Sequence, residues 1–203
     1  MKKLFLLVFM VMMTTAAFGQ EKMSVVSGGF EVLKDQTEVN VELKFEDVLL
    51  MKENITETQY LENRKKQVLD NPKRGEEAWK TWIAEWEKYK NEEYIRYFSK
   101  GLNKTYKESF FKKDISSKYT LLLETKWIFP GWHAGLTMMT AEISGKIKLV
   151  ETSNPSVVLA EVELNKFDRF VYNDEMVMEY GRIAGAYESA GRYLGKKIKK
   201  SLK

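Results

Sequence analysis

The sequence predicts a single α+β domain with a mixed, mostly antiparallel sheet of four to five strands and helices packed mainly on one face. Two observations lead to this class. Apolar and polar residues alternate, as in strands, before residue 46 and again between residues 119 and 170. Between these regions, and again near the C-terminus, apolar residues recur every three or four positions, as in amphipathic helices. The order of elements is therefore strands, a helical excursion, more strands and a closing helix.

The first 19 residues have the composition of a secretory signal peptide. Two lysines precede ten apolar residues, Leu4–Met13, and small residues follow. Ala17 and Gly19 fit the small-x-small rule for cleavage before Gln20. A ten-residue helix spans about 15 Å, half of a bilayer's hydrocarbon core, so a membrane anchor is the weaker alternative. We expect an exported protein, residues 20–203, in the periplasm or at the outer-membrane periphery.

The composition of the expected mature chain limits its partners. It carries 31 Lys and Arg residues against 29 acidic ones, and this balance gives no concentrated basic face for nucleic acid. The chain has no cysteine, so no disulfide and no lipid-carrying cysteine is available, and the core must supply the stability. After Met13 no apolar run is long enough to span a membrane.

Two strands are predicted before the helical excursion. Met23–Leu33 is short, mixed and interrupted by two glycines, so we expect a brief edge strand there. In Val39–Glu46 the apolar and polar residues alternate strictly. This pattern predicts a strand with one buried and one solvated face.

Residues 56–117 are predicted to be mainly helical. Thr56 and Gln59 have the spacing of a capping box, and Asp70-Asn71-Pro72 ends this first helix. A second helix has an apolar stripe formed by Trp79, Trp82, Ile83, Trp86 and Tyr89. The stripe then resumes one position out of step, at Tyr94, Ile95, Phe98 and Leu102. The slip, near Asn91, predicts a kink, a bulge or two successive helices.

Residues 119–170 give the densest strand pattern and predict a three-stranded antiparallel meander. Its segments are Tyr119–Phe129, Leu136–Val150 and Val157–Phe170. Two turn-rich loops, Pro130–Gly135 and Thr152–Ser156, separate them. We expect the helices to bury this sheet.

A closing helix is predicted over residues 173–203, with Asn173 as its N-cap. Four glycines lie on it in two pairs with four-residue spacing: Gly181 and Gly185, then Gly191 and Gly195. Each lowers helix propensity by about 1 kcal/mol relative to alanine, but small residues at this spacing allow close approach to a sheet or another helix. Five lysines between 196 and 203 place positive charge at the C-terminal end of the helix, where the helix dipole favours it. We interpret them as a solvated helix end, with weak attachment to an anionic surface as the alternative.

Few residues offer catalytic chemistry. His133 is the only histidine, and metalloprotease, serine-hydrolase, phosphate-loop and calcium-loop motifs are absent from the sequence. A zinc site would need its remaining ligands from Asp and Glu. We therefore expect no metal ion and no cofactor, and we favour a protein that is not an enzyme. His133 as a general base beside a carboxylate is the alternative.

Two groups of residues are candidates for binding. Trp132, His133 and Met138 lie on or just beyond the Pro130–Gly135 loop, where exposed aromatic and methionine side chains suit partner recognition. For Trp132 taken alone, folding back as a lid on the core is the favoured interpretation, and exposure for partner recognition is the alternative. The second group is Trp79, Trp82 and Trp86, a possible platform for sugar rings. Leaving all three exposed forfeits up to about 15 kcal/mol of burial, so core packing is the favoured interpretation.

The closing segment 182–196 reads Arg-Ile-Ala-Gly-Ala-Tyr-Glu-Ser-Ala-Gly-Arg-Tyr-Leu-Gly-Lys. Together with the order of elements, it resembles a family of exported bacterial α/β proteins with no assigned activity. More distantly, the layout is similar to the periplasmic domains of the penicillin-binding-protein activator LpoB, the curli secretion protein CsgG and the amino-terminal domain of TolB. The resemblance implies an adaptor or assembly role without catalytic residues. The chain lacks the lipid-carrying cysteine of LpoB and CsgG, and no functional residue carries over.

The sequence thus favours a non-catalytic exported accessory or binding protein of the cell envelope, with an envelope protein or a glycan as partner. One alternative is a glycan or peptide hydrolase, which needs His133 within about 3 Å of a carboxylate. Another is a small-ligand carrier, which needs a cavity of at least about 300 Å³ lined by the helix aromatics. The preferred site is the Pro130–Gly135 loop.

Overall fold

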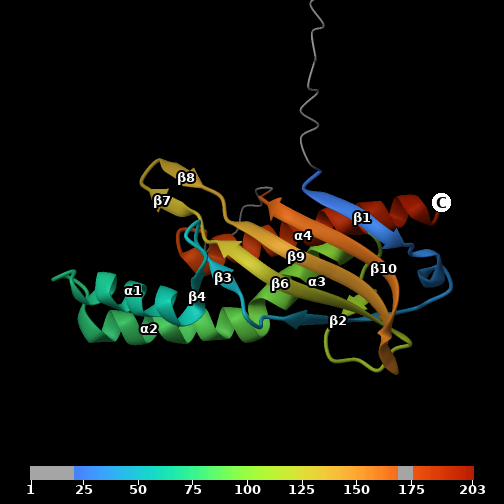
Figure 1. The fold of residues 1–203 in the computed structure, drawn as a ribbon, viewed down its shortest axis with the longest axis horizontal. Helices are drawn as coiled ribbons and strands as arrows, with labels where there is room; N and C mark the ends of the chain where they lie inside the picture. Colours follow the sequence, from blue (N-terminus) through green and yellow to red (C-terminus); the bar gives the residue numbers. More distant parts are fainter. Residues whose placement is uncertain (1–20, 169–175) are drawn as a thin grey trace, which may run out of the picture.

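The computed structural model describes residues 21–168 and 176–203. The expected signal peptide and the expected helix cap Asn173 lie outside the described residues. Within them the chain forms one α+β unit around a mixed sheet of eight strands (Figure 1). The prediction of four to five strands was therefore too low.

The sheet has the strand order β1-β10-β9-β6-β2-β5, with β3 and β4 attached beside the end of β6. Its long strands are β1 (Met23–Gly28), β2 (Val39–Lys44), β6 (Tyr119–Phe129), β9 (Glu142–Glu151) and β10 (Asn154–Phe167). The strands that the sequence did not predict are β3 (Leu49–Leu50), β4 (Ile55–Thr56) and β5 (Phe111–Lys112). Two residues are too few to show a period-two pattern, and this explains the low count.

Strands β6, β9 and β10 form the expected antiparallel meander, with Leu123 opposite Ile147 and Ile147 opposite Val162. The expected second strand, however, is divided. Thr137–Met139 (β8) pairs with Trp132–Ala134 (β7) in a separate hairpin, and β9 begins only at Glu142. β2 and β3 both run parallel to β6, one beside its first half and the other beside its end, so the sheet is mixed.

The first strand is shorter than expected. It ends at Gly28, whose φ of 66° is accessible to glycine, and a Cβ at this position would overlap the carbonyl of Leu159. A 3-10 helix, η1 (Glu31–Leu33), follows where the edge strand was expected to continue.

The helical excursion contains α1 (Glu57–Leu69), α2 (Gly75–Lys88), the π-helical turn η2 (Tyr89–Glu93) and α3 (Tyr94–Thr105). The capping box of α1 is confirmed, since Thr56 Oγ1 accepts from the Gln59 amide at 3.2 Å and Gln59 Oε1 accepts from the Thr56 amide at 3.0 Å. The turn η2 lies where the apolar stripe slips by one position. A π turn adds one residue to the helix, so the expected bulge is present.

The closing helix α4 (Glu179–Ser201) begins six residues later than the predicted cap, and Met176 and Val177 precede it. It packs along α3 through glycines on both helices. A Cβ on Gly191 would overlap the carbonyl oxygen of Phe98, and one on Gly101 would overlap a carbonyl oxygen of α4. The expected close approach of the α4 glycines is therefore present at Gly191, and the neighbour is a helix.

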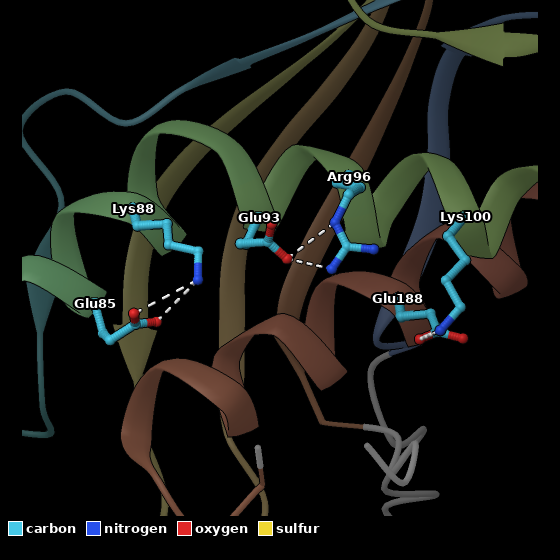
Figure 2. Close-up of polar contacts among 6 residues, drawn as sticks. All are labelled: Glu85, Lys88, Glu93, Arg96, Lys100 and Glu188. Carbon is cyan, nitrogen blue, oxygen red and sulfur yellow. Dashed lines mark hydrogen bonds and ion pairs between the residues drawn. The ribbon is translucent and has the colours of Figure 1, made fainter. Parts of the chain in front are cut away.

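A fully buried carboxylate reinforces the contact between α3 and α4. Lys100 of α3 lies 3.0 Å from one carboxylate oxygen of Glu188 on α4 (Figure 2). Arg192, one turn further along α4, binds the other oxygen. The remaining ion pairs of Figure 2, Lys88 with Glu85 and Arg96 with Glu93, lie within the α2–η2–α3 helix. The Lys100–Glu188 pair thus joins two helices that are distant in sequence.

Helices α3 and α4 cover one face of the sheet (Figure 1), and the core lies between these helices and the sheet. The opposite face of the sheet is polar, because lysines and glutamates stand opposite one another on neighbouring strands. Lys148 lies 2.8 Å from Glu124, and Lys146 lies 2.7 Å from Glu161. The α1–α2 pair extends beyond the end of the sheet, on the side from which the β7–β8 hairpin projects.

Candidate functional site

The β7–β8 hairpin projects from the end of β6 and β9, away from the body of the protein (Figure 1). Trp132 pairs with Met139, and His133 with Met138, so the predicted binding residues Trp132, His133 and Met138 come together on this one element. Gly135, with φ of 60°, and Leu136 form a two-residue turn. A glycine in the first position with positive φ is the arrangement of a type II′ hairpin turn.

The hairpin is apolar and exposed. Leu136 at its turn is fully accessible, Trp132 is 45% exposed and Met139 is 39% exposed. Residues 130–141 contain no Asp, Glu, Lys or Arg, whereas such residues make up 31% of the chain. Trp132 therefore does not fold back as a lid on the core. The arrangement leaves an uncharged, protruding element on a charged molecule.

Arg182 of α4 fixes the root of the hairpin. Its Nε donates to the Pro130 carbonyl at 2.9 Å and its Nη2 to the Gly131 carbonyl at 3.3 Å, while Nη1 donates to the Val177 carbonyl at 2.6 Å. The side chain is buried, and this burial lowers the pKa of the guanidinium. Four carbonyl contacts, including one to Met176, satisfy the buried cation, so one residue ties the hairpin to the start of α4.

Close packing at the root adds a second constraint. Gly131 has φ of 66°, and a Cβ there would overlap the Met139 carbonyl across the base of the hairpin. The sequence analysis did not identify Arg182 as a functional residue. The available signal was a lone arginine inside the small and apolar run 180–187, where a buried charge needs partners.

A cleft of about 390 Å³ opens at the root of the hairpin, between Pro130 and Gly131, the β3–β4 connection and α1. Tyr60 and Pro130 give it an apolar part, and Arg64 and Glu179 are among its polar residues. Arg64 pairs with Glu179 at 2.7 Å and thereby joins α1 to the start of α4. Pro130 and Gly131, the residues at the root of the hairpin, therefore also line the cleft.

The tryptophans of α2 lie apart from the hairpin. Trp82 and Trp86 are buried and Trp79 is half-buried, and the three rings stack with centroids 5.5 and 5.4 Å apart. Trp86 Nε1 donates to Glu57 at 2.8 Å, and its ring lies 5.3 Å from that of Tyr60. The contacts are those of a structural layer between α1 and α2, and the faces of Trp82 and Trp86 are covered.

His133 is exposed on the hairpin, and no carboxylate among residues 21–168 and 176–203 forms an ion pair with it. The geometry gives His133 no carboxylate partner of the kind that a general base requires. In the same described residues, no three His, Asp or Glu side chains form a group that could hold a metal ion. None of the described helices is long and apolar enough to cross a membrane.

Comparison with known proteins adds no identification: no family model matches the sequence, and neither the curated proteins nor the solved structures give a significant match. The functional argument therefore depends on the geometry of the chain itself. Of the surfaces described above, the hairpin and the cleft at its root are the two that offer a binding site.

Proposed function

We propose that the protein is a non-catalytic accessory or binding protein of the cell envelope and that it contacts its partner through the β7–β8 hairpin. The exposure of Leu136, Trp132 and Met139 on one uncharged element carries this proposal. Monomeric proteins seldom expose apolar side chains together without a binding role. The layout similarity to LpoB, CsgG and TolB implies the same class of function.

The way the hairpin is held favours binding by a prepared surface. Arg182 and Gly131 fix its root, and the three residue pairs between β7 and β8 fix its form. A prepared surface loses little conformational freedom on binding, which lowers the entropic cost of association. On the polar face of the sheet, by contrast, Lys146 pairs with Glu161 and Lys148 pairs with Glu124.

The proposal is tested by recovery of partners from the envelope fraction of the source cells. Mature protein carrying a photo-crosslinking residue at position 136 is expected to capture an envelope component, and a Trp132→Ser change in the same protein is expected to reduce that capture. The matched control carries the crosslinker at position 158, where Val158 is 43% exposed on β10. Equal capture from positions 136 and 158, or none from either, would contradict a binding role for the hairpin.

A small-ligand carrier is the second candidate, and the volume of the cleft at the hairpin root favours it. At about 390 Å³ the cleft reaches the size of a ligand site, although Tyr60 is the only helix aromatic among its lining residues. Native mass spectrometry of protein purified from its source is expected to show a bound small molecule under this second proposal. Loss of that species in Arg64→Met, with the fold intact, would assign it to the cleft.

A further inference from the structure

We propose that the partner of the β7–β8 hairpin is the lipid–water interface of an anionic membrane, into which Leu136 and Trp132 insert. This inference rests on the proposed binding role of the hairpin and names the chemistry of its partner. Three observations carry it: the uncharged composition of the hairpin, its convex shape, and two lysines near its root that form no ion pair with a described carboxylate.

The composition of the hairpin matches the depth profile of an interface. Leucine stands at the apex and is fully exposed, while tryptophan stands on a strand below it. Apolar side chains enter the acyl boundary readily, and tryptophan favours the headgroup level. A charged residue within the inserted segment would oppose entry, and residues 130–141 contain no Asp, Glu, Lys or Arg.

The shape of the hairpin favours a deformable partner over a rigid one. Stable protein interfaces bury about 800 Å² on each partner, and their strongest contacts fill pockets. The hairpin has three residues on each strand and a two-residue turn, so its apex is a small convex tip. Its strands also pair with each other, which satisfies backbone groups that would otherwise be costly to bring out of water.

Lysines at the root complement an anionic surface. Lys52 lies over the Phe129 ring at 5.3 Å, and Lys166 lies over the Trp127 ring at 5.6 Å. Within residues 21–168 and 176–203, neither lysine forms an ion pair with a carboxylate. Glu142 lies in the same depression as the two lysines and leaves one net positive charge there. The charge therefore assists an attachment that is mainly apolar.

The test is flotation of the mature protein with vesicles of phosphatidylcholine alone and of phosphatidylcholine with phosphatidylglycerol. We expect the wild-type protein to float with the mixed vesicles and Leu136→Ser to bind them about tenfold more weakly, as loss of one buried leucine implies. Lys52→Gln together with Lys166→Gln is expected to weaken binding several-fold on the anionic vesicles only. Val158→Ser, at a position on β10 that is 43% exposed and far from the hairpin, serves as the control and is expected to bind like the wild type.

Four results would overturn the inference. Vesicle binding that Leu136→Ser leaves unchanged would place the lipid contact elsewhere, and loss on neutralising the lysines at 196–203 would place it at the end of α4. Absence of vesicle binding, with hairpin-dependent capture of an envelope protein, would make the partner a protein and leave the proposed function standing. Absence of both would remove the proposed function as well. Circular dichroism of each variant separates these outcomes from misfolding.

Discussion

Replacing Arg182 by methionine is the most direct test of how the hairpin is held. Methionine keeps much of the volume and the unbranched shape of the side chain but removes every donor. The Pro130 carbonyl, which lies 2.9 Å from Nε, then loses its donor. Because Pro130 is buried, water does not readily replace that donor. The Val177 carbonyl, 2.6 Å from Nη1, belongs to an exposed residue and can turn to water.

The expected loss of stability follows from these two environments. A buried acceptor left without a donor costs about 1–3 kcal/mol, and an exposed one costs much less. Burial disfavours the charged form of Arg182 and lowers its pKa, so removing the cation offsets part of this loss of stability. We therefore expect Arg182→Met to lower the free energy of unfolding by about 2 kcal/mol.

Urea denaturation followed by circular dichroism measures this change, with Arg96→Met as the matched control. Arg96 is 58% exposed, and its ion pair with Glu93 and its contact with the Tyr97 ring both lie on the same helix. Its replacement is therefore expected to change stability by less than about 1 kcal/mol. Amide hydrogen exchange supplies a second readout, because a hairpin released at its root should exchange faster at residues 132–139. Equal stability losses in the two variants, with unchanged exchange in the hairpin, would refute the anchoring role.

Two pairs of core substitutions test the packing of the helices. Gly191→Ala is expected to destabilise by about 1–3 kcal/mol, because its methyl group would meet backbone of α3, with the Phe98 carbonyl oxygen nearest. Gly195→Ala should cost less, because the nearest backbone atom, the Leu102 carbonyl oxygen, is farther away, at 2.8 Å, and the closer contact is the Thr105 side chain. Urea midpoints compare the two, and a more stable Gly191→Ala would contradict the close approach. Tyr94→Phe should be neutral or stabilising, since the buried Tyr94 hydroxyl has no hydrogen-bond partner in the described structure. Tyr187→Phe should lose about 1 kcal/mol with its 2.7 Å bond to Thr125, and thermal melts of both proteins decide the order.

The long elements could be predicted from the sequence because each has its own period. The alternating residues of β2 and the shifted stripe around η2 both contain the information locally. Gly101 shows the limit of this approach. A single glycine within a helix has no local signal, and its role becomes evident only when Gly191 is found packed against the same stretch of α3.

The sequence predicted the location of the candidate site but not its form. Trp132 and Met138 were assigned to a loop and to the start of a long strand, because Thr137–Met139 continues the apolar pattern toward Ile143 without a turn residue. Arg182 was missed, because its partner carbonyl at Pro130 is 52 residues away in the sequence. The acceptors of Arg182 are backbone carbonyls, and no residue type in the sequence marks their position.

The predicted strand Leu136–Val150 was wrong in the same segment that forms the candidate site, Thr137–Met139, and this has a physical reason. A strand that continued from Leu136 in the register of β9 would place Met139 on the buried face of the sheet, and Leu136 and Met138 on its polar face. Instead the chain leaves the sheet after Phe129, and Gly131 and Arg182 hold that departure in place. Leu136 is consequently fully exposed, and no part of the described protein buries it. Apolar side chains that the fold holds outside the core gain burial only from a partner, and the proposed membrane interface would supply it.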